Sequence, residues 1–184
     1  TALSAGDIQR LYENREIKNP SLFGTVATTI TDTYDSSIIA TPYNGATFTT
    51  AGAEFDGVDD YVDLTPWMLG GSITIEMYFK YDSFSHRYMT PLKFGPDGVV
   101  EESNGNPFAA DSIYITNTDI TGGGGFRIVD GDTFHKINGS SDFFSQGEWV
   151  HFVATASGTT IKMYKNGILN ESDTSATEPN TILR

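Results

Sequence analysis

An acid-rich stretch over residues 54–64 contains the side chains with the clearest capacity for chemistry. It reads EFDGVDDYVDL and places carboxylates at Asp56, Asp59, Asp60 and Asp63. Carboxylates this close together repel one another unless they accept backbone N–H hydrogen bonds, remain solvated or share a hard cation. Strand alternation turns Asp60 and Asp63 to opposite faces, so the four cannot all serve one site. We therefore predict a calcium site formed by Asp56, Asp59 and Asp60.

The same aspartates have a second interpretation, as caps of a turn. Asp56 and Gly57 form a tight-turn signal that leads into a short strand at residues 61–64. In this interpretation Asp56 and Asp59 accept hydrogen bonds from turn N–H groups, and the other carboxylates face water. Both interpretations place a polar corner beside the strand, and only the first requires a metal ion.

Aromatic rings in the predicted loops are the candidates for ligand binding. Sugars stack on exposed rings, and four aromatic residues fall in loops that could present a ring: Trp67, Tyr88, Phe108 and Phe134. The alternative is that Trp67 closes one end of the fold and the other rings seal loops onto the core. Trp149 differs from these four because it begins a predicted strand, and we expect it in the core.

The histidines and two short motifs give weaker indications of function. His86, His135 and His151 are scattered without the spacing of metal ligands, so we expect structural roles for them. Two sequons, at Asn138 and Asn170, would accept N-glycans if the protein passes through a eukaryotic secretory pathway. Motifs as short as these also arise by chance.

The composition excludes several classes of protein. Lys and Arg total 11 against 24 Asp and Glu, and the net charge of -13 argues against nucleic-acid binding, which needs basic residues to neutralise phosphates. The absence of cysteine excludes disulfides and zinc–thiolate sites. No apolar run approaches the roughly 20 residues of a membrane helix, so we predict no membrane insertion. The 38% of hydrophobic residues over 184 positions are enough for a packed core.

Short strands separated by turn residues dominate the chain. The clearest strand is residues 72–80, SITIEMYFK, where the apolar side chains share one face and Thr74, Glu76, Tyr78 and Lys80 share the other. The predicted hairpins pair residues 112–116 with 125–129, 149–155 with 160–165, and 160–165 with 168–171.

Turn and cap signals complete the prediction of fold class. Asn166-Gly167 is the strongest two-residue turn signal, and the glycine run at residues 122–125 predicts a flexible turn. Only residues 4–15 predict a helix, with Ser4 as N-cap and Asp7 near the capping-box position. The fold class that follows is all-β: an antiparallel β-sandwich with one short N-terminal helix.

Three segments together resemble a known family. They are residues 55–64 (FDGVDDYVDL), 72–80 (SITIEMYFK) and 147–169 (GEWVHFVATASGTTIKMYKNGIL). In this order and spacing they resemble the laminin-G-like jelly rolls of the concanavalin A-like lectin/glucanase superfamily. The resemblance implies a concanavalin A-like jelly roll that acts as a non-catalytic recognition module, often for carbohydrate and often with calcium.

The enzymes of that superfamily offer a test for catalysis. Those that cut glycans need two carboxylates across the scissile bond, commonly arranged as E-x-D-x-x-E on one strand. This pattern is absent here, because Glu76 has Thr74 and Tyr78 at the flanking positions of its strand face. A lone carboxylate cannot serve both as acid and as nucleophile or base, so we predict that the protein is not an enzyme.

The two ends of the chain suggest a particular domain organisation. Residues 1–18 resemble the way such domains finish, with a short helix after the last strand, and the chain stops at Arg184, where the family still has closing strands. We expect residues 1–18 to end a preceding module, and residues 19–184 to form a laminin-G-like jelly roll that lacks its closing strands. The alternative is that the helix packs on its own domain and that a neighbouring chain supplies the last strands. Either case leaves an open sheet edge, and such edges pair with other chains.

Two hypotheses of function follow. The first is an extracellular recognition or adhesion module that binds a glycan, or neighbouring protein modules, through loops at one edge of the jelly roll. The second is a structural repeat of a surface filament, envelope or virion appendage, which forms a homo-oligomer through its open sheet edge. Both hypotheses place the protein outside the cell or on a surface, whether secreted, on the cell surface or on a virion.

Overall fold

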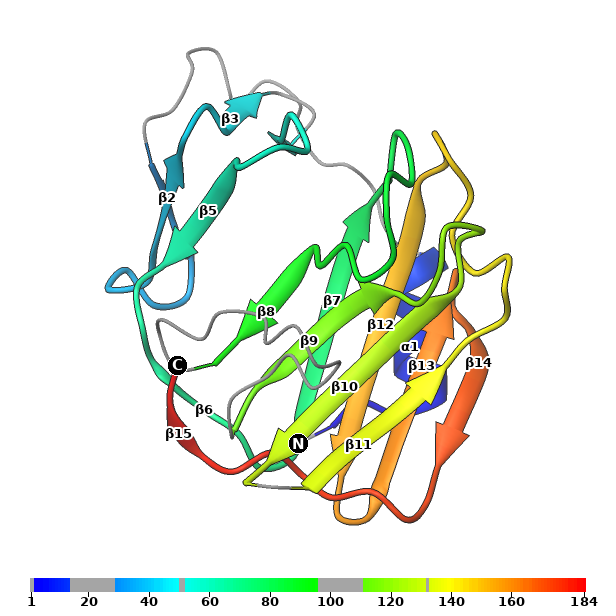
Figure 1. Ribbon diagram of the computed structural model, residues 1–184. Helices are drawn as coiled ribbons and strands as arrows, with labels where there is room; N and C mark the ends of the chain where they lie inside the picture. Colours follow the sequence, from blue (N-terminus) through cyan, green and yellow to red (C-terminus); the bar gives the residue numbers. More distant parts are fainter. Residues whose placement is uncertain (1, 14–28, 50–51, 96–110, 132) are drawn as a thin grey trace. The chain divides into compact units, whose positions relative to one another are not determined.

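The computed structural model describes residues 2–13, 29–49, 52–95, 111–131 and 133–184 (Figure 1). The chain divides into two compact units. Unit 1 comprises Thr1–Arg15 and Met68–Arg184, and unit 2 comprises Glu16–Trp67. In the described part of the chain, no helix has the length and apolar character needed to cross a membrane.

Unit 1 is a sandwich of two four-stranded antiparallel sheets (Figure 1). The first sheet has the order β14-β13-β12-β7, with β7 at Ile73–Phe79, β12 at Val150–Ser157, β13 at Thr160–Lys165 and β14 at Ile168–Asp173. The second has the order β11-β10-β9-β8, with β8 at Leu92–Phe94, β9 at Ile113–Asn117, β10 at Gly124–Asp130 and β11 at Thr133–Asn138. These sheets confirm the predicted all-β jelly-roll sandwich.

The core lies between the two sheets and follows from the period-two pattern of the strands. On β7, Ile73 and Ile75 are buried, whereas Glu76 and Tyr78 on the opposite face are exposed. Both sheets contribute fully buried side chains to the core, including Ile113, Ile115, Phe126, Ile128, Phe152, Ile161 and Met163. Removing this apolar surface from water is the main favourable contribution to folding.

Helix α1, Ala5–Glu13, begins at the predicted capping box. The Asp7 N–H donates to Ser4 Oγ at 3.2 Å, and the Ser4 N–H donates to Asp7 Oδ2 at 3.3 Å. These two bonds satisfy backbone groups that a helix N-terminus otherwise leaves without partners.

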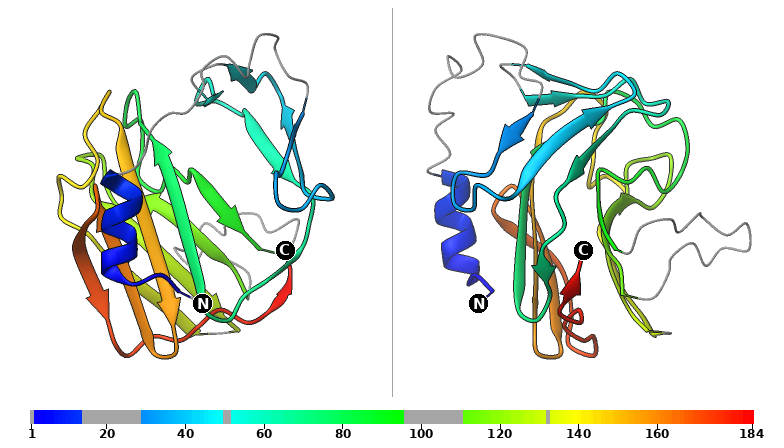
Figure 2. Two further views of the ribbon diagram at one scale, coloured as in Figure 1. Left: turned by 180° about the vertical axis from the view of Figure 1, so that it is seen from behind. Right: turned by 90° about the vertical axis from the view of Figure 1, so that its left-hand side faces the viewer.

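Helix α1 packs on the outer face of the first sheet, the face turned away from the core (Figure 2). Its fully buried residue is Ile8, which forms a second apolar cluster with Val153 and Tyr164 of the sheet. The Leu3 N–H also donates to Thr74 Oγ1 of β7 at 2.9 Å. A helix that ends a preceding module could pack in this way too, so the module boundary at residue 18 stays a prediction.

The turn predicted at Asn166-Gly167 joins β13 to β14. Asn166 has φ of 51° and Gly167 has φ of 79°. Two successive positive φ values are the requirement of a type I′ turn, whose twist matches that of the flanking strands. The Asn-Gly signal therefore predicted this hairpin correctly.

The glycine run at residues 122–125 is packed tightly, so its prediction as a flexible turn was wrong. A Cβ atom on Gly124, the first residue of β10, would lie 2.6 Å from ring atoms of Phe143. A Cβ atom on Gly122 would lie 1.9 Å from the carbonyl oxygen of Phe144. These glycines allow the Phe143 and Phe144 backbone and rings to approach β10 closely.

A two-stranded ladder closes one end of unit 1. Strand β6, Met68–Leu69, pairs antiparallel with β15, Ile182–Leu183. The buried Arg184 side chain follows β15 and donates to the backbone carbonyl oxygens of Leu69, Asn180 and Asp111. The guanidinium therefore connects three separate segments at this end of the unit.

Unit 2 consists of two small antiparallel sheets. One has the order β1-β2-β5, with β1 at Ile30–Thr31, β2 at Ile39–Tyr43 and β5 at Tyr61–Leu64; the other pairs β3, Thr47–Thr49, with β4, Gly52–Glu54. Strand β5 is the strand predicted at residues 61–64. The loop between β4 and β5 carries the acidic stretch, so the structure of this loop decides how the aspartates are arranged.

Candidate metal centre

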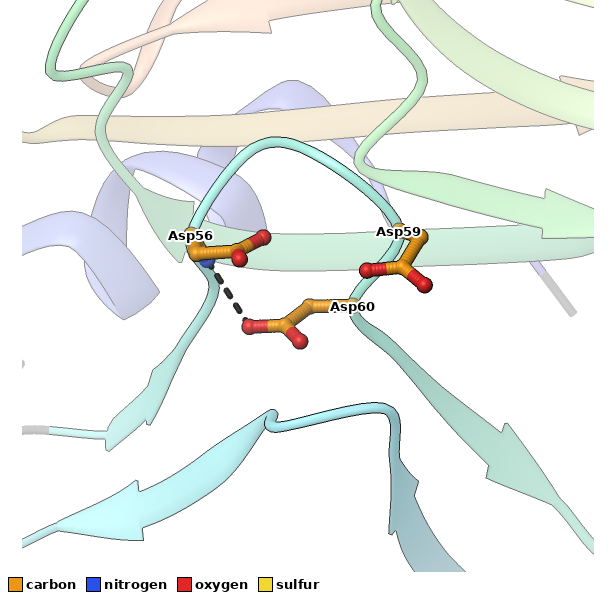
Figure 3. A group of neighbouring side chains, drawn as sticks. All are labelled: Asp56, Asp59 and Asp60. Atoms are coloured by element: carbon orange, nitrogen blue, oxygen red, sulfur yellow. Dashed lines mark hydrogen bonds between the residues drawn. The ribbon is translucent and has the colours of Figure 1, made fainter.

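The β4–β5 loop brings Asp56, Asp59 and Asp60 together (Figure 3). One carboxylate oxygen from each lies within 4.8 Å of the others, and Figure 3 shows the three carboxyl groups turned toward one another. Two oxygens that bind one calcium ion at about 2.4 Å each are at most about 5 Å apart. A single calcium ion can therefore bridge the three carboxylates.

Hydrogen bonds within the loop hold this arrangement. The Val58 N–H donates to Asp56 Oδ1 at 2.8 Å, and the Asp56 N–H donates to Asp60 Oδ2 at 2.8 Å. Asn44 Nδ2 donates to the backbone oxygen of Asp59 at 3.0 Å and connects the loop to the β2–β3 turn. Asp56 is thus a turn cap, and this role is compatible with metal binding because each carboxylate has a second oxygen.

Asp60 Oδ1 is the oxygen that most needs a cation. It is buried and has no hydrogen-bond partner in the part of the chain that the structure describes. Gly45, with φ of +128°, stands beside it, and a Cβ atom there would lie 2.8 Å from this oxygen. A buried carboxylate oxygen without a partner is costly unless a positive charge compensates it.

The donor set fits a hard cation. All three candidate ligands are carboxylate oxygens, which calcium prefers, and water would complete the six to eight ligands that calcium takes. Asp56 and Asp59 are exposed, so water can reach the cluster. Asp63 lies outside it, since it is an exposed residue of β5 paired with Thr41 of β2. The alternation of strand residues predicted this separation.

The aromatic residues predicted to bind ligand are distributed over both units. Trp67 lines a surface pocket of about 410 Å³ in unit 2, together with Ile30, Asp32, Ile38, Ala40 and Leu64. Tyr88 is exposed in a loop of unit 1 with φ of 66°, and the Arg87 guanidinium carbon lies 4.9 Å from its ring centroid. Phe134 is also exposed, although it belongs to β11 and not to the predicted loop. Phe108 lies outside the described residues.

Tyr88 and Phe134 do not form one site within unit 1. The Tyr88 N–H donates to the carbonyl oxygen of Asn117, at one end of β9. Phe134 pairs with Val129, whose N–H donates to the carbonyl oxygen of Ser112, at the other end. About 17 Å of strand separates these two positions, because each strand residue advances by about 3.3 Å.

Trp149 is not the core residue that the sequence predicted. Its side chain is exposed on the outer face of the first sheet, where it stacks on Tyr78. The alternation of strand β12 contained the missing signal. Val150 and Phe152 face the core, so their neighbours Trp149 and His151 face outward.

The first sheet also holds a buried histidine. His151 Nε2 lies 2.7 Å from Glu76 Oε1, and the ring centroid lies 5.6 Å from that of Tyr12 in α1. The His151 side chain is buried under these contacts. Its surroundings fit the expected structural role.

The two sequon asparagines differ in the freedom of their side chains. Asn138 is the last residue of β11, and its Oδ1 accepts a hydrogen bond from Arg127 Nη2 at 2.6 Å. Arg127 is buried, so this bond holds the amide on which a glycan would be built. Asn170 is exposed on β14 and is the more accessible of the two candidates.

Comparison with known proteins identifies the family. A laminin G family model, described as "Concanavalin A-like lectin/glucanases superfamily", matches residues 56–182, which is well over half of the chain. The chain belongs to the concanavalin A-like lectin/glucanases superfamily. The match begins at Asp56 and extends into β15, so this superfamily's pattern includes the acidic loop and both sheets of the sandwich.

Further relatives of this superfamily member are distant. No curated protein matches the sequence closely enough to count as a relative. One similar solved structure is the 2.1 Å crystal structure of an S-layer domain-containing protein from Clostridium thermocellum. It is 22% identical over 76% of this chain and 62% of that chain, with a TM-score of 0.38. The present chain therefore spans less than two thirds of that protein's structure.

Proposed function

We propose that this protein is a non-catalytic, extracellular recognition module that binds carbohydrate and uses calcium at the acidic loop. The observation that carries the proposal is the arrangement of Asp56, Asp59 and Asp60, with the buried Asp60 Oδ1 lacking a hydrogen-bond partner among the described residues. A calcium ion at this position would fix the β4–β5 loop, and its remaining coordination positions could take hydroxyl groups of a sugar. The superfamily match supports a module of this kind.

The surroundings of Glu76 support a module without catalytic activity. The outer-face neighbours of Glu76 on β7 and β12 are Thr74, Tyr78, Val153 and His151, and none of these is a carboxylate. Hydrolysis of a glycosidic bond by the usual mechanisms needs a second carboxylate roughly 5 to 10 Å away. Glu76 therefore has the role of a hydrogen-bonding group and not of one member of a catalytic pair.

The charge of the protein bears on its partners and location. A net charge of -13 opposes binding to nucleic acid and to anionic lipid, and it favours divalent cations and neutral glycans. Glycans or neighbouring protein modules are therefore the proposed partners. A secreted or surface-exposed location suits such partners. A chain made of a preceding module's helix and a jelly roll without its closing strands remains part of this proposal.

The second candidate function is a self-associating structural repeat of a surface filament, envelope or virion appendage. Strand β14 supports it, because this strand ends the order of the first sheet and exposes Ile168 and Leu169. Apolar side chains on an edge strand favour pairing with a further strand from another copy. This arrangement would form a homo-oligomer without any glycan.

A glycan array with and without calcium tests the proposed function. We expect specific, competable binding in 1 mM calcium, with at least tenfold weaker binding after a chelator is added or in the Asp60→Asn variant. Asp63→Asn is the matched control, because Asp63 belongs to the same acidic stretch but lies outside the cluster. Blank arrays, together with concentration-dependent polymerisation in light scattering, would replace the first candidate with the second.

A further inference from the structure

Two large aromatic rings stand open on the outer face of the first sheet. Tyr78 of β7 and Trp149, which directly precedes β12, stack with ring centroids 4.9 Å apart and planes inclined by 12°. Their side chains are 42% and 41% exposed. Tryptophan is among the residues that proteins bury most of the time, and exposed aromatic surface of this kind marks interaction sites.

The position of the two rings follows from the register of the strands. Tyr78 pairs with His151, and Trp149 lies two residues before His151 on the same face. Elsewhere on this face the side chains are covered, because Ile8 of α1 packs on Val153 and Tyr164. The covering helix ends near Tyr12, whose ring contacts His151. The stacked pair therefore lies on the part of the face beside the helix.

Charged groups of opposite sign flank the pair along β7. Glu76 and Lys80 lie two residues before and after Tyr78 on the same face, each about 7 Å away along the strand. The Glu76 carboxylate is 41% exposed and is held by His151 Nε2 at 2.7 Å. Lys80 Nζ is held by Asp82 Oδ1 at 2.5 Å. The aromatic surface thus has a hydrogen-bond acceptor on one side and a donor on the other.

These properties together select the class of ligand. An apolar protein surface would bury the Glu76 and Lys80 charges without compensation, which is costly. A quaternary ammonium ion would gain from the rings and from Glu76 but would be repelled by Lys80. A pyranose ring has an apolar C–H face that can lie on an aromatic ring, and its rim of hydroxyl groups both donates and accepts hydrogen bonds.

We propose that the Tyr78–Trp149 pair, with Glu76 and Lys80 beside it, is a calcium-independent binding site for a neutral pyranose unit of a glycan. The site rests on the proposed function, carbohydrate recognition, and adds a second contact that uses only side chains of unit 1. Trp149 supplies the aromatic surface with Tyr78. Glu76 accepts hydrogen bonds from sugar hydroxyls, and Lys80 donates to them.

The fluorescence of Trp149 provides the test. The chain has 2 tryptophans, so the Trp67→Phe variant leaves Trp149 as the single emitter. This variant is titrated in EDTA with neutral hexasaccharides derived from β-glucan, xylan, mannan and chitin. We expect a saturable change in Trp149 emission with at least one of them. If Trp67→Phe does not fold, the same change is measured in the unaltered protein and should disappear in Trp149→Phe.

Variants separate a binding role from a structural one. Binding measured by calorimetry should weaken at least tenfold in Trp149→Ala and Tyr78→Ala, and several-fold in Glu76→Gln, while melting temperatures show that each variant is folded. Tyr34→Ala is the matched control, since Tyr34 is a fully exposed aromatic residue of unit 2. Unchanged binding in Trp149→Ala would overturn the proposal, as would binding of tetramethylammonium in place of the hexasaccharides.

The outcomes distinguish this site from the acidic loop. Glycan binding that is abolished by EDTA and unaffected by Trp149→Ala would retain the proposed function and reject this site. Glycan binding that persists in EDTA and is lost in Trp149→Ala would support this site and reject the role of calcium. Failure of all glycans to bind under both conditions would reject both proposals.

Discussion

His151 Nε2 and Glu76 Oε1 lie 2.7 Å apart on the outer face of the first sheet, where they join a buried imidazole to a partly exposed carboxylate. An ionised carboxylate only accepts hydrogen bonds, so the ring donates from Nε2. The other ring nitrogen, Nδ1, is buried and accepts no hydrogen bond from any residue within the described ranges. Glu76 is therefore the hydrogen-bond partner on which the His151 ring depends.

Removal of this partner should destabilise the fold. In Glu76→Ala the His151 N–H loses its acceptor, and we expect the free energy of unfolding in urea to fall by about 1 to 2 kcal/mol. In Glu76→Gln the amide oxygen still accepts, so the decrease should be smaller than in Glu76→Ala. Equal losses in the two variants would mean that the hydrogen bond does not contribute to stability.

Calcium should raise the melting temperature, and a chelator should lower it. At a calcium concentration about 100 times its Kd, binding to the folded state alone stabilises by about 2.7 kcal/mol. Asp60→Asn should lose most of this increase, because it replaces the one buried carboxylate oxygen that has no hydrogen bond in the described structure. Asp63→Asn should retain the increase. Differential scanning calorimetry with and without calcium makes the comparison, and identical melting curves would remove the metal site.

A methyl group at Gly124 should be damaging, whereas one at Gly6 should not. The Cβ atom of Gly124→Ala would lie 2.6 Å from the Phe143 ring, and overpacking of this kind costs about 1 to 3 kcal/mol. In Gly6→Ala the nearest atoms are 3.9 Å away and the residue is helical, so we expect stabilisation of about 0.5 kcal/mol. Chemical denaturation compares the two variants. A tolerated alanine at Gly124 would show that the glycine run is loosely packed after all.

Acid should weaken the loop that begins at Asp119. The hydrogen bond from the Thr121 hydroxyl to Asp119 lowers the pKa of this carboxyl below its ordinary value of 3.8. A lowered pKa in the folded state contributes stability that is fully present above the ordinary value and is lost as the pH falls through the lowered one. Asp119→Asn removes this titration, so the stability difference between wild type and variant should shrink between pH 6 and pH 3.

Comparison of variants isolates this effect from the rest of the titration. Protonation of other carboxylates also relieves the repulsion within a protein of net charge -13. Only the difference between wild type and variant, measured by thermal unfolding at each pH, therefore reports on Asp119. Thr121→Val should reduce the acid sensitivity as well, because the hydroxyl is the main cause of the pKa shift. Parallel stability curves for all three proteins over this pH range would contradict the prediction.

Local signals in the sequence predicted much of the fold. The alternation in residues 72–80 and the Asn166-Gly167 signal each describe a structure that is set by neighbouring residues, and both appear in unit 1. The capping box at Ser4 is local in the same sense. The acidic loop could also be predicted in part, because its three candidate ligands lie within five residues of one another.

Features that depend on distant residues were not predicted. Trp149 was expected in the core because of its hydrophobicity, but its face of the sheet is decided by the register of β12 against β7. Gly124 was expected in a flexible turn, because its contact with Phe143 joins residues that the local pattern does not relate. Strand β11, which contains Phe134, was missed because its mixed sequence has no strict alternation and its pairing with β10 defines it.

The ladder of β6 and β15 gives unit 1 a particular response to mechanical force. Met68 pairs with Leu183, and Leu69 pairs with Ile182, so the chain enters and leaves this ladder at the same end. A pull on the chain before Met68 and after Arg184 would open the ladder like a zipper, one pair at a time, instead of shearing it. The Arg184 side chain binds three segments beside this ladder. It would therefore act as the catch that carries the load first.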